Sequence, residues 1–177
     1  MTTLRFLLRG VMLTLLASCA ANSQSWNANE PLQPTPPAMS LTITVLHASS
    51  QCAPSVSTQW IASQAQFATL FQATQSHMIS PAPPPAPAVD FSQFGVVLLS
   101  MGQQRSGGYA IKLAQEELSM HQDFAEIAVY WQEPQPGMMV TQAITHPCIF
   151  LRVPRGNYQR VRVVDQNNKL RAELTVI

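Results

Sequence analysis

Short segments with the pattern of β-strands fill the second half of this chain. They are Phe94–Leu99, Tyr109–Leu113, Glu126–Trp131, Cys148–Val153, Arg160–Val164 and Leu170–Ile177. Most of them alternate apolar and polar residues, as strands do when only one face is buried. The run Phe94–Leu99 is apolar throughout, which predicts a central strand. The polar stretch Asp165–Lys169 between the last two segments predicts a hairpin turn.

Three more elements are predicted between residues 41 and 76. Leu41–Leu46 alternates like a strand, and Thr58–Ala62 has the composition of a shorter one. Ser63 followed by Gln66 is typical of a capping box and predicts a helix that ends near Ser76. This helix places three apolar residues on one face, namely Phe67, Leu70 and Phe71. We therefore predict an α+β, mainly β fold, an antiparallel sheet or sandwich of about seven short strands with one helix.

The first nineteen residues have the pattern of an export signal. Arg5 and Arg9 precede an apolar stretch, Gly10–Leu16, that is too short to span a bilayer. The stretch ends in Leu16-Ala-Ser-Cys19, which resembles the lipobox of bacterial lipoproteins. The resemblance implies cleavage before Cys19, a diacylglycerol on its thiol and an acyl chain such as palmitate on the new amino terminus. The alternative is an ordinary signal peptide with a chance cysteine.

The lipoprotein interpretation divides the chain into three parts. Residues 1–18 are the signal peptide, residues 19–39 a flexible proline-rich tether and residues 40–177 a single β-rich domain. Ala20 after the cysteine resembles the outer-membrane default of enterobacterial lipoproteins, so we expect a lipid-anchored protein of the bacterial envelope, in contact with the periplasm. A second proline-rich stretch, Pro81–Pro87, predicts a surface loop, with a ligand for a proline-reading groove as the alternative.

Two cysteines remain if Cys19 carries lipid. Because the periplasm is oxidising, we expect a disulfide between Cys52 and Cys148. The alternatives are an exposed thiol at Cys52 and a buried thiol at Cys148, which lies in an apolar run.

Charged residues make up only 11% of the chain, and the formal net charge is +1. This composition argues against an electrostatically driven nucleic-acid binder, so we expect no nucleic-acid partner. The sequence lacks a Gly-x-Ser-x-Gly elbow, and its four histidines are not spaced as metal ligands. They are His47, His77, His121 and His146. We predict no catalytic residue, metal or cofactor, with a hydrolase assembled by the fold as the rival hypothesis.

The most distinctive motif is Ser100–Ile111. Its adjacent glycines, Gly107 and Gly108, permit positive φ and a tight connection, which we interpret as a hairpin turn. The part Gly102–Tyr109 resembles the Gly…Thr/Ser-Gly-Gly-Tyr motif in the C-terminal domain of the PrcB family of protease complex subunits.

Further matches to the PrcB family follow along the chain. Pro136–Pro147 contains a Pro-Gly loop, Thr-Gln-Ala and Thr-x-Pro, and Val153-Pro-Arg155 ends the next apolar strand. Asp90-Phe91 also fits, so the resemblance covers Val89–Asp165. It implies a lipid-anchored accessory protein that binds a protein partner and assists the maturation or stability of a secreted, subtilisin-like protease complex.

Two other functions are alternatives to this interpretation. The segment Arg105-Ser-Gly-Gly-Tyr109 with a later Pro-Gly loop is similar to the loops of chagasin-like inhibitors of cysteine proteases, with Ser-Gly-Gly-Tyr in place of their Thr-Thr-Gly-Tyr. The third hypothesis is a structural lipoprotein that binds the cell wall.

Both protein-binding hypotheses place the partner site on two loops at one edge of the domain. The candidate residues are Gln103, Arg105, Ser106, Gly107, Gly108, Tyr109, Met138 and Met139. Flexible, polarizable methionine side chains suit a protein partner. The alternative is that the two methionines cap the core beneath the loop.

Arginines are concentrated near the end of the chain. They are Arg152, Arg155, Arg160, Arg162 and Arg171. We interpret them as a solvated face that blocks edge pairing, since Arg160 and Arg162 share one face of a strand. The alternative is contact with lipid phosphates or with the acids of peptidoglycan.

Overall fold

The computed structural model describes residues 41–75 and 84–177. The predicted signal peptide, Cys19 and the tether 19–39 lie outside these residues, as does the first part of Pro81–Pro87. The described remainder of that proline-rich stretch forms neither helix nor strand. No helix in residues 41–75 or 84–177 is long and apolar enough to cross a membrane.

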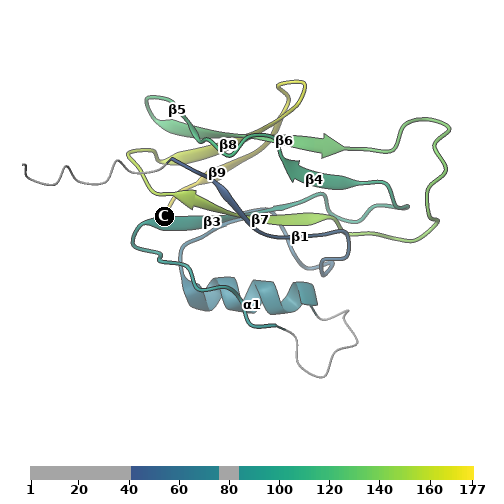
Figure 1. The fold of residues 1–177 in the computed structure, drawn as a ribbon, viewed down its shortest axis with the longest axis horizontal. Helices are drawn as coiled ribbons and strands as arrows, with labels where there is room; N and C mark the ends of the chain where they lie inside the picture. The colour runs from purple at the N-terminus through teal and green to yellow at the C-terminus, as the bar shows by residue number, and fades with distance from the viewer. Residues whose placement is uncertain (1–40, 76–83) are drawn as a thin grey trace, which may run out of the picture. The chain divides into compact units, whose positions relative to one another are not determined.

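Nine strands and one helix make up the described part of the chain (Figure 1). In chain order they are β1 (Thr44–Ser49), β2 (Gln59–Ile61), α1 (Gln64–Gln75), β3 (Phe94–Ser100), β4 (Ala110–Leu113), β5 (Ser119–Met120), β6 (Phe124–Gln132), β7 (Cys148–Pro154), β8 (Arg160–Asp165) and β9 (Leu170–Thr175). The α+β, mainly β prediction is confirmed. The sequence did not predict β5, because two residues are too few to show a period.

The strands form two sheets that face each other. One has the order β1-β7-β3-β2, and the other has the order β4-β6-β8-β9 with β5 paired to β6. The fold is therefore a sandwich. One pair, β6 and β8, is parallel, whereas the other pairs are antiparallel. The parallel pair arises because the chain leaves its sheet after β6, forms β7 in the other sheet and then returns.

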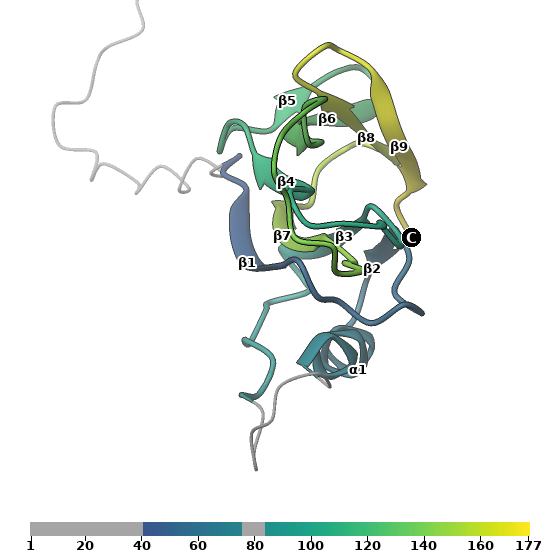
Figure 2. The ribbon, with the colours of Figure 1, turned by 90° about the vertical axis from the view of Figure 1, so that its right-hand side faces the viewer.

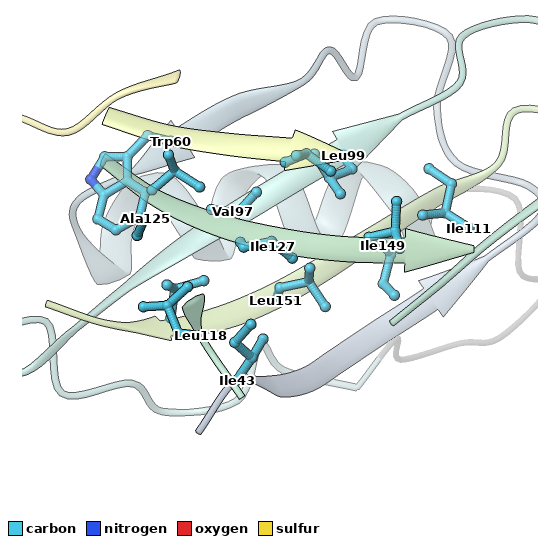
Figure 3. Packing of buried hydrophobic residues seen from close by; sticks show 14 of the residues in the cluster. Ile43, Trp60, Val97, Leu99, Ile111, Leu118, Ala125, Ile127, Ile149 and Leu151 are labelled. Atoms are coloured by element: carbon cyan, nitrogen blue, oxygen red, sulfur yellow. The ribbon is translucent and has the colours of Figure 1, made fainter. Parts of the chain in front are cut away.

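A core of buried apolar side chains lies between the sheets (Figure 3). Val97 and Leu99 of β3 belong to this core, while Val96 and Leu98 of the same strand belong to a second cluster on the other side. β3 is thus buried on both faces, which accounts for its uninterrupted apolar sequence and confirms the predicted central strand.

Helix α1 covers the outer side of the β1-β7-β3-β2 sheet (Figure 1). The Ser63 hydroxyl accepts a hydrogen bond from the Gln66 amide at 3.3 Å, as the capping pattern predicts. Phe67 and Phe71 then pack against Phe150 of β7, with ring centroids 5.5 and 6.0 Å apart. The described domain therefore has three layers, with the first sheet in the middle.

A disulfide joins Cys52 to Cys148, whose Cα atoms are 6.1 Å apart. The predicted pairing is confirmed. Both cysteines are buried in the cluster beneath α1. The bond links the segment after β1 to the first residue of β7, so it fixes the start of β7.

We predict that removing this disulfide lowers the free energy of unfolding by about 2–4 kcal/mol, because the bond closes a loop between residues 96 positions apart. Urea unfolding of Cys52→Ala/Cys148→Ala measures the loss. The wild-type protein with a reductant is the matched comparison, since it keeps both side chains. Two free thiols in the non-reduced protein by mass spectrometry, or an unchanged unfolding midpoint, would contradict the prediction.

Candidate functional site

The Gly107-Gly108 segment connects the two sheets. It lies between β3 of one sheet and β4 of the other, and these two strands do not pair. The hairpin interpretation is therefore wrong. A sequence period shows which residues share a face of a strand, but it does not show which strand lies beside it.

This connection packs against the one between β6 and β7. Gln104 and Thr145 exchange two backbone hydrogen bonds, of 2.8 and 3.0 Å, and the Gly107 amide donates to the Thr141 carbonyl at 2.9 Å. The Thr145 hydroxyl donates to the Ser106 carbonyl at 2.8 Å. We call residues 101–109 and 133–147 the loop platform. The two predicted binding loops therefore lie together and hold each other in place.

Both adjacent glycines are required by this close packing. A Cβ at Gly107 would overlap the Thr141 hydroxyl. Gly108 has a φ of +89°, and a Cβ there would lie 2.9 Å from a methyl carbon of Val140. Residues other than glycine rarely adopt this φ, and the neighbouring loop leaves no space for a side chain. The Gly-Gly pair thus permits the contact between the loops.

Three apolar side chains of the platform are exposed to solvent. Met139 is 99% exposed, Met138 54% and Ile144 57%. The two methionines therefore do not cap the core beneath the loop. Ile144 was not predicted as a site residue, and its isolated position in a polar stretch was the available indication. Exposed apolar side chains on a loop held in place by hydrogen bonds are typical of a protein-docking surface.

The other predicted residues lie along the first loop. Gln103 and Arg105 are exposed, Ser106 and Tyr109 are half-buried, and Arg105 forms no ion pair within the described residues. The side-chain amide of Gln132 donates to the Gly108 carbonyl at 3.3 Å and ties this loop to the end of β6. The exposed residues of the platform thus include polar, cationic and apolar side chains.

The arginines do not form a free basic surface. Arg160 pairs with Asp123, and Glu173 lies 3.3 Å from Arg160 and 3.4 Å from Arg162. Arg171 pairs with Asp165 at 2.7 Å. Because β8 lies between β6 and β9, Arg160 and Arg162 are not on an edge strand and do not block edge pairing. That part of the interpretation is wrong.

The other two arginines also have partners. Arg152 donates to the Thr44 hydroxyl at 2.9 Å and lies over the Phe94 ring, 4.7 Å from its centroid. Arg155 donates to the Phe94 carbonyl at 3.3 Å. Arg152 and Arg155 therefore contact other residues of the domain and help to hold its strands together.

The carboxylate of Asp165 holds the turn between β8 and β9. Burial favours its neutral form, but the amides of Asn167 and Lys169 and the Arg171 guanidinium donate to it, so its pKa lies below the usual range. Asn168 of this turn has a φ of +58°. The hairpin predicted at Asp165–Lys169 is confirmed.

A groove of about 610 Å³ lies at the end of the second sheet. It is lined by Lys112, Tyr130, Trp131, Gln132, Glu133, Gln135, Gln166, Asn167 and Arg171. The lining contains no histidine, serine or cysteine, and its titratable side chains are those of Lys112, Tyr130, Glu133 and Arg171. Within residues 41–75 and 84–177, no three His, Cys, Asp or Glu side chains are grouped so that they could hold a metal ion.

We predict that Gly108→Ala destabilises the domain by about 2–4 kcal/mol, because it combines a positive φ with a clash. Gly102→Ala is the matched control, since Gly102 also has a positive φ, +68°, but no heavy atom lies within 4 Å of its Cβ position. It should cost only about 1–2 kcal/mol. Urea unfolding of both variants gives the difference, and equal losses would contradict the packing argument.

One family model matches part of the chain. The family model described as PrcB C-terminal matches residues 96–154, about a third of the chain. The matched segment begins in β3, ends with β7 and contains both parts of the loop platform. It confirms the resemblance predicted from the Gly-Gly-Tyr and Pro-Gly motifs. No curated protein and no solved structure matches the chain.

Proposed function

We propose, from the PrcB C-terminal domain at residues 96–154, that this protein is a lipid-anchored accessory subunit of a protease complex in the bacterial envelope. The loop platform is its docking surface for the partner protein. The match to the PrcB C-terminal family model supports the accessory role in a protease complex. The lipobox pattern at Cys19 supports the anchor, and the geometry of the platform supports the docking surface.

One observation carries the docking part of this proposal. Met138, Met139 and Ile144 are all more than half exposed, and all three lie within the family-matched segment. Exposed side chains of this kind gain free energy when a partner covers them, and methionine adapts its shape to the opposing surface. The hydrogen bonds between the two loops already hold the backbone in place, so little conformational entropy is lost on binding.

We predict that Met138→Ser/Met139→Ser lowers the amount of protease captured with the full-length protein from native membranes by at least about tenfold, since docking would lose two apolar contacts. Quantitative mass spectrometry of the captured material measures the effect. The fold should remain intact, because both side chains are exposed.

The matched control is Met120→Ser. Met120 is 40% exposed on β5, outside the platform, and this variant should capture as much protease as the wild-type protein. Equal capture by the platform variant would reject the platform as the docking surface. Complete inhibition of the bound protease would favour the chagasin-like alternative.

For the anchor, we predict that Cys19→Ser moves the protein from the detergent-rich phase to the aqueous phase in Triton X-114 partitioning, because it removes the thiol that receives the lipid. Ser18→Ala is the control, since it keeps this thiol and should remain in the detergent phase. A Cys19→Ser protein that still enters the detergent phase would reject the lipid anchor.

A further inference from the structure

Strands β1 and β4 are edges of the two facing sheets. β1 pairs only with β7, and β4 pairs only with β6, among the strands of the described residues. Figure 2 shows these two edges on the same side of the sandwich. An unpaired strand edge offers a row of backbone N–H and C=O groups to any extended chain that can reach it.

The two edges are joined at one end. The Ile43 amide donates to the Glu116 carbonyl at 2.6 Å, and the Leu118 amide donates to the Leu41 carbonyl at 2.9 Å. Ile43 and Leu118 lie close together in Figure 3. Beyond Ile43 the chain turns to pair with β7, so β4 has no partner on this side. The pairing of Leu41 and Ile43 with Glu116 and Leu118, just beyond β4, thus shows that an extended segment can lie along this edge.

An apolar groove of about 470 Å³ lies between the edges where they separate. Its lining consists of Val45, Ala48, Ile111, Lys112, Leu113, Ala114, Gln115, Glu116 and Ile149. Ile111 and Ile149 belong to the core between the sheets, and Val45 is 44% exposed at the wall. A smaller hollow of about 210 Å³ shares Ile111 and Lys112 with this groove and extends it to Tyr109 of the platform.

The register of β4 shows which of its backbone groups face the groove. The Ala114 amide donates to the Ala128 carbonyl at 3.0 Å, so alternate residues before it, such as Lys112, also bond to β6. Trp131, which is opposite Ile111, uses its backbone groups for the Gln166 side chain. The N–H and C=O groups of Ile111 and Leu113 therefore point away from β6, toward the groove.

We propose that an extended segment of the partner protein lies in this groove and pairs with β4 as an added strand. The inference rests on the proposed function, because the partner is the one that docks on the loop platform. The smaller hollow that adjoins the groove reaches Tyr109 of that platform, so one partner chain can contact both surfaces. Pairing supplies affinity through the backbone, and the groove selects the side chains that alternate along the segment.

The lining predicts the sequence pattern of this segment. Residues on one of its faces lie against the exposed apolar part of the lining, Val45 and Ala48, and are apolar. Residues on its other face lie beside the exposed Lys112, where an acidic side chain is favoured across the strands. The segment is therefore an alternating apolar and polar strand with an acidic residue on its polar face.

Leu113→Pro provides a sharp test, because proline removes an N–H that points into the groove and leaves the bonds to β6 intact. Leu113→Ala is the matched control, since it removes a similar amount of side chain but keeps the N–H.

The probe is a phage-displayed library of random twelve-residue peptides, selected on the full chain in detergent. We expect alternating peptides with an acid on the polar face that slow exchange of the Ile111 and Leu113 amides at least about tenfold.

Leu113→Pro should weaken binding of these peptides at least tenfold more than Leu113→Ala does. If Leu113→Pro fails to fold, Val45→Asp at the groove wall should produce the same loss. Met138→Ser/Met139→Ser should leave peptide affinity unchanged, so failure of the groove is distinguishable from failure of the platform.

Selected peptides without alternation, or unchanged exchange at β4, would overturn the proposal. A concentration-dependent dimer abolished by Leu113→Pro would also overturn it, by assigning the groove to a second copy.

Discussion

The pairing of β3 with β7 is the interaction on which the rest of the domain depends. The two strands are aligned from Phe94 opposite Pro154 to Ser100 opposite Cys148, without a register shift. Both are buried on both faces, one face against the opposite sheet and the other against α1. The backbone groups of such a ladder have no access to water, so each must be paired within the sheet. The position of this ladder determines where the following loops emerge.

The loop platform is a consequence of that placement. The connection from β3 to β4 begins beside the point where the connection from β6 to β7 ends, because Ser100 is opposite Cys148. Both connections run between the first sheet and the second. The disulfide holds Cys148 at the same end. Two loops that emerge side by side can exchange hydrogen bonds, and the absence of side chains at Gly107 and Gly108 lets them approach. Rigidity in the core is thus transmitted to the proposed docking surface.

Much of this fold could be predicted from the sequence, and the errors have a common cause. The apolar run of β3, the helix cap at Ser63 and the turn at Asp165–Lys169 are local patterns, and all are found in the structure. The assignment of strands to sheets is not local, so Gly107-Gly108 was interpreted as a hairpin and β8 as an edge. The contact between the two loops and the exposure of Ile144 likewise depend on distant residues, which periodicity does not report.

The two edges of the second sheet differ in a way that relates to function. β9 carries Arg171 and Glu173, and charged side chains on an edge strand discourage pairing with another chain. On the opposite side, Lys112 is the only charged residue of β4, and β1 has no acidic residue, lysine or arginine. The charge is thus unevenly distributed between the two edges, since β9 carries a cation and an acid, whereas β4 carries Lys112 alone beside the apolar Val45, Ala48 and Leu113. An edge strand with a single charged residue beside an apolar groove favours association with an extended chain, which is the property that an accessory subunit with a protein partner requires.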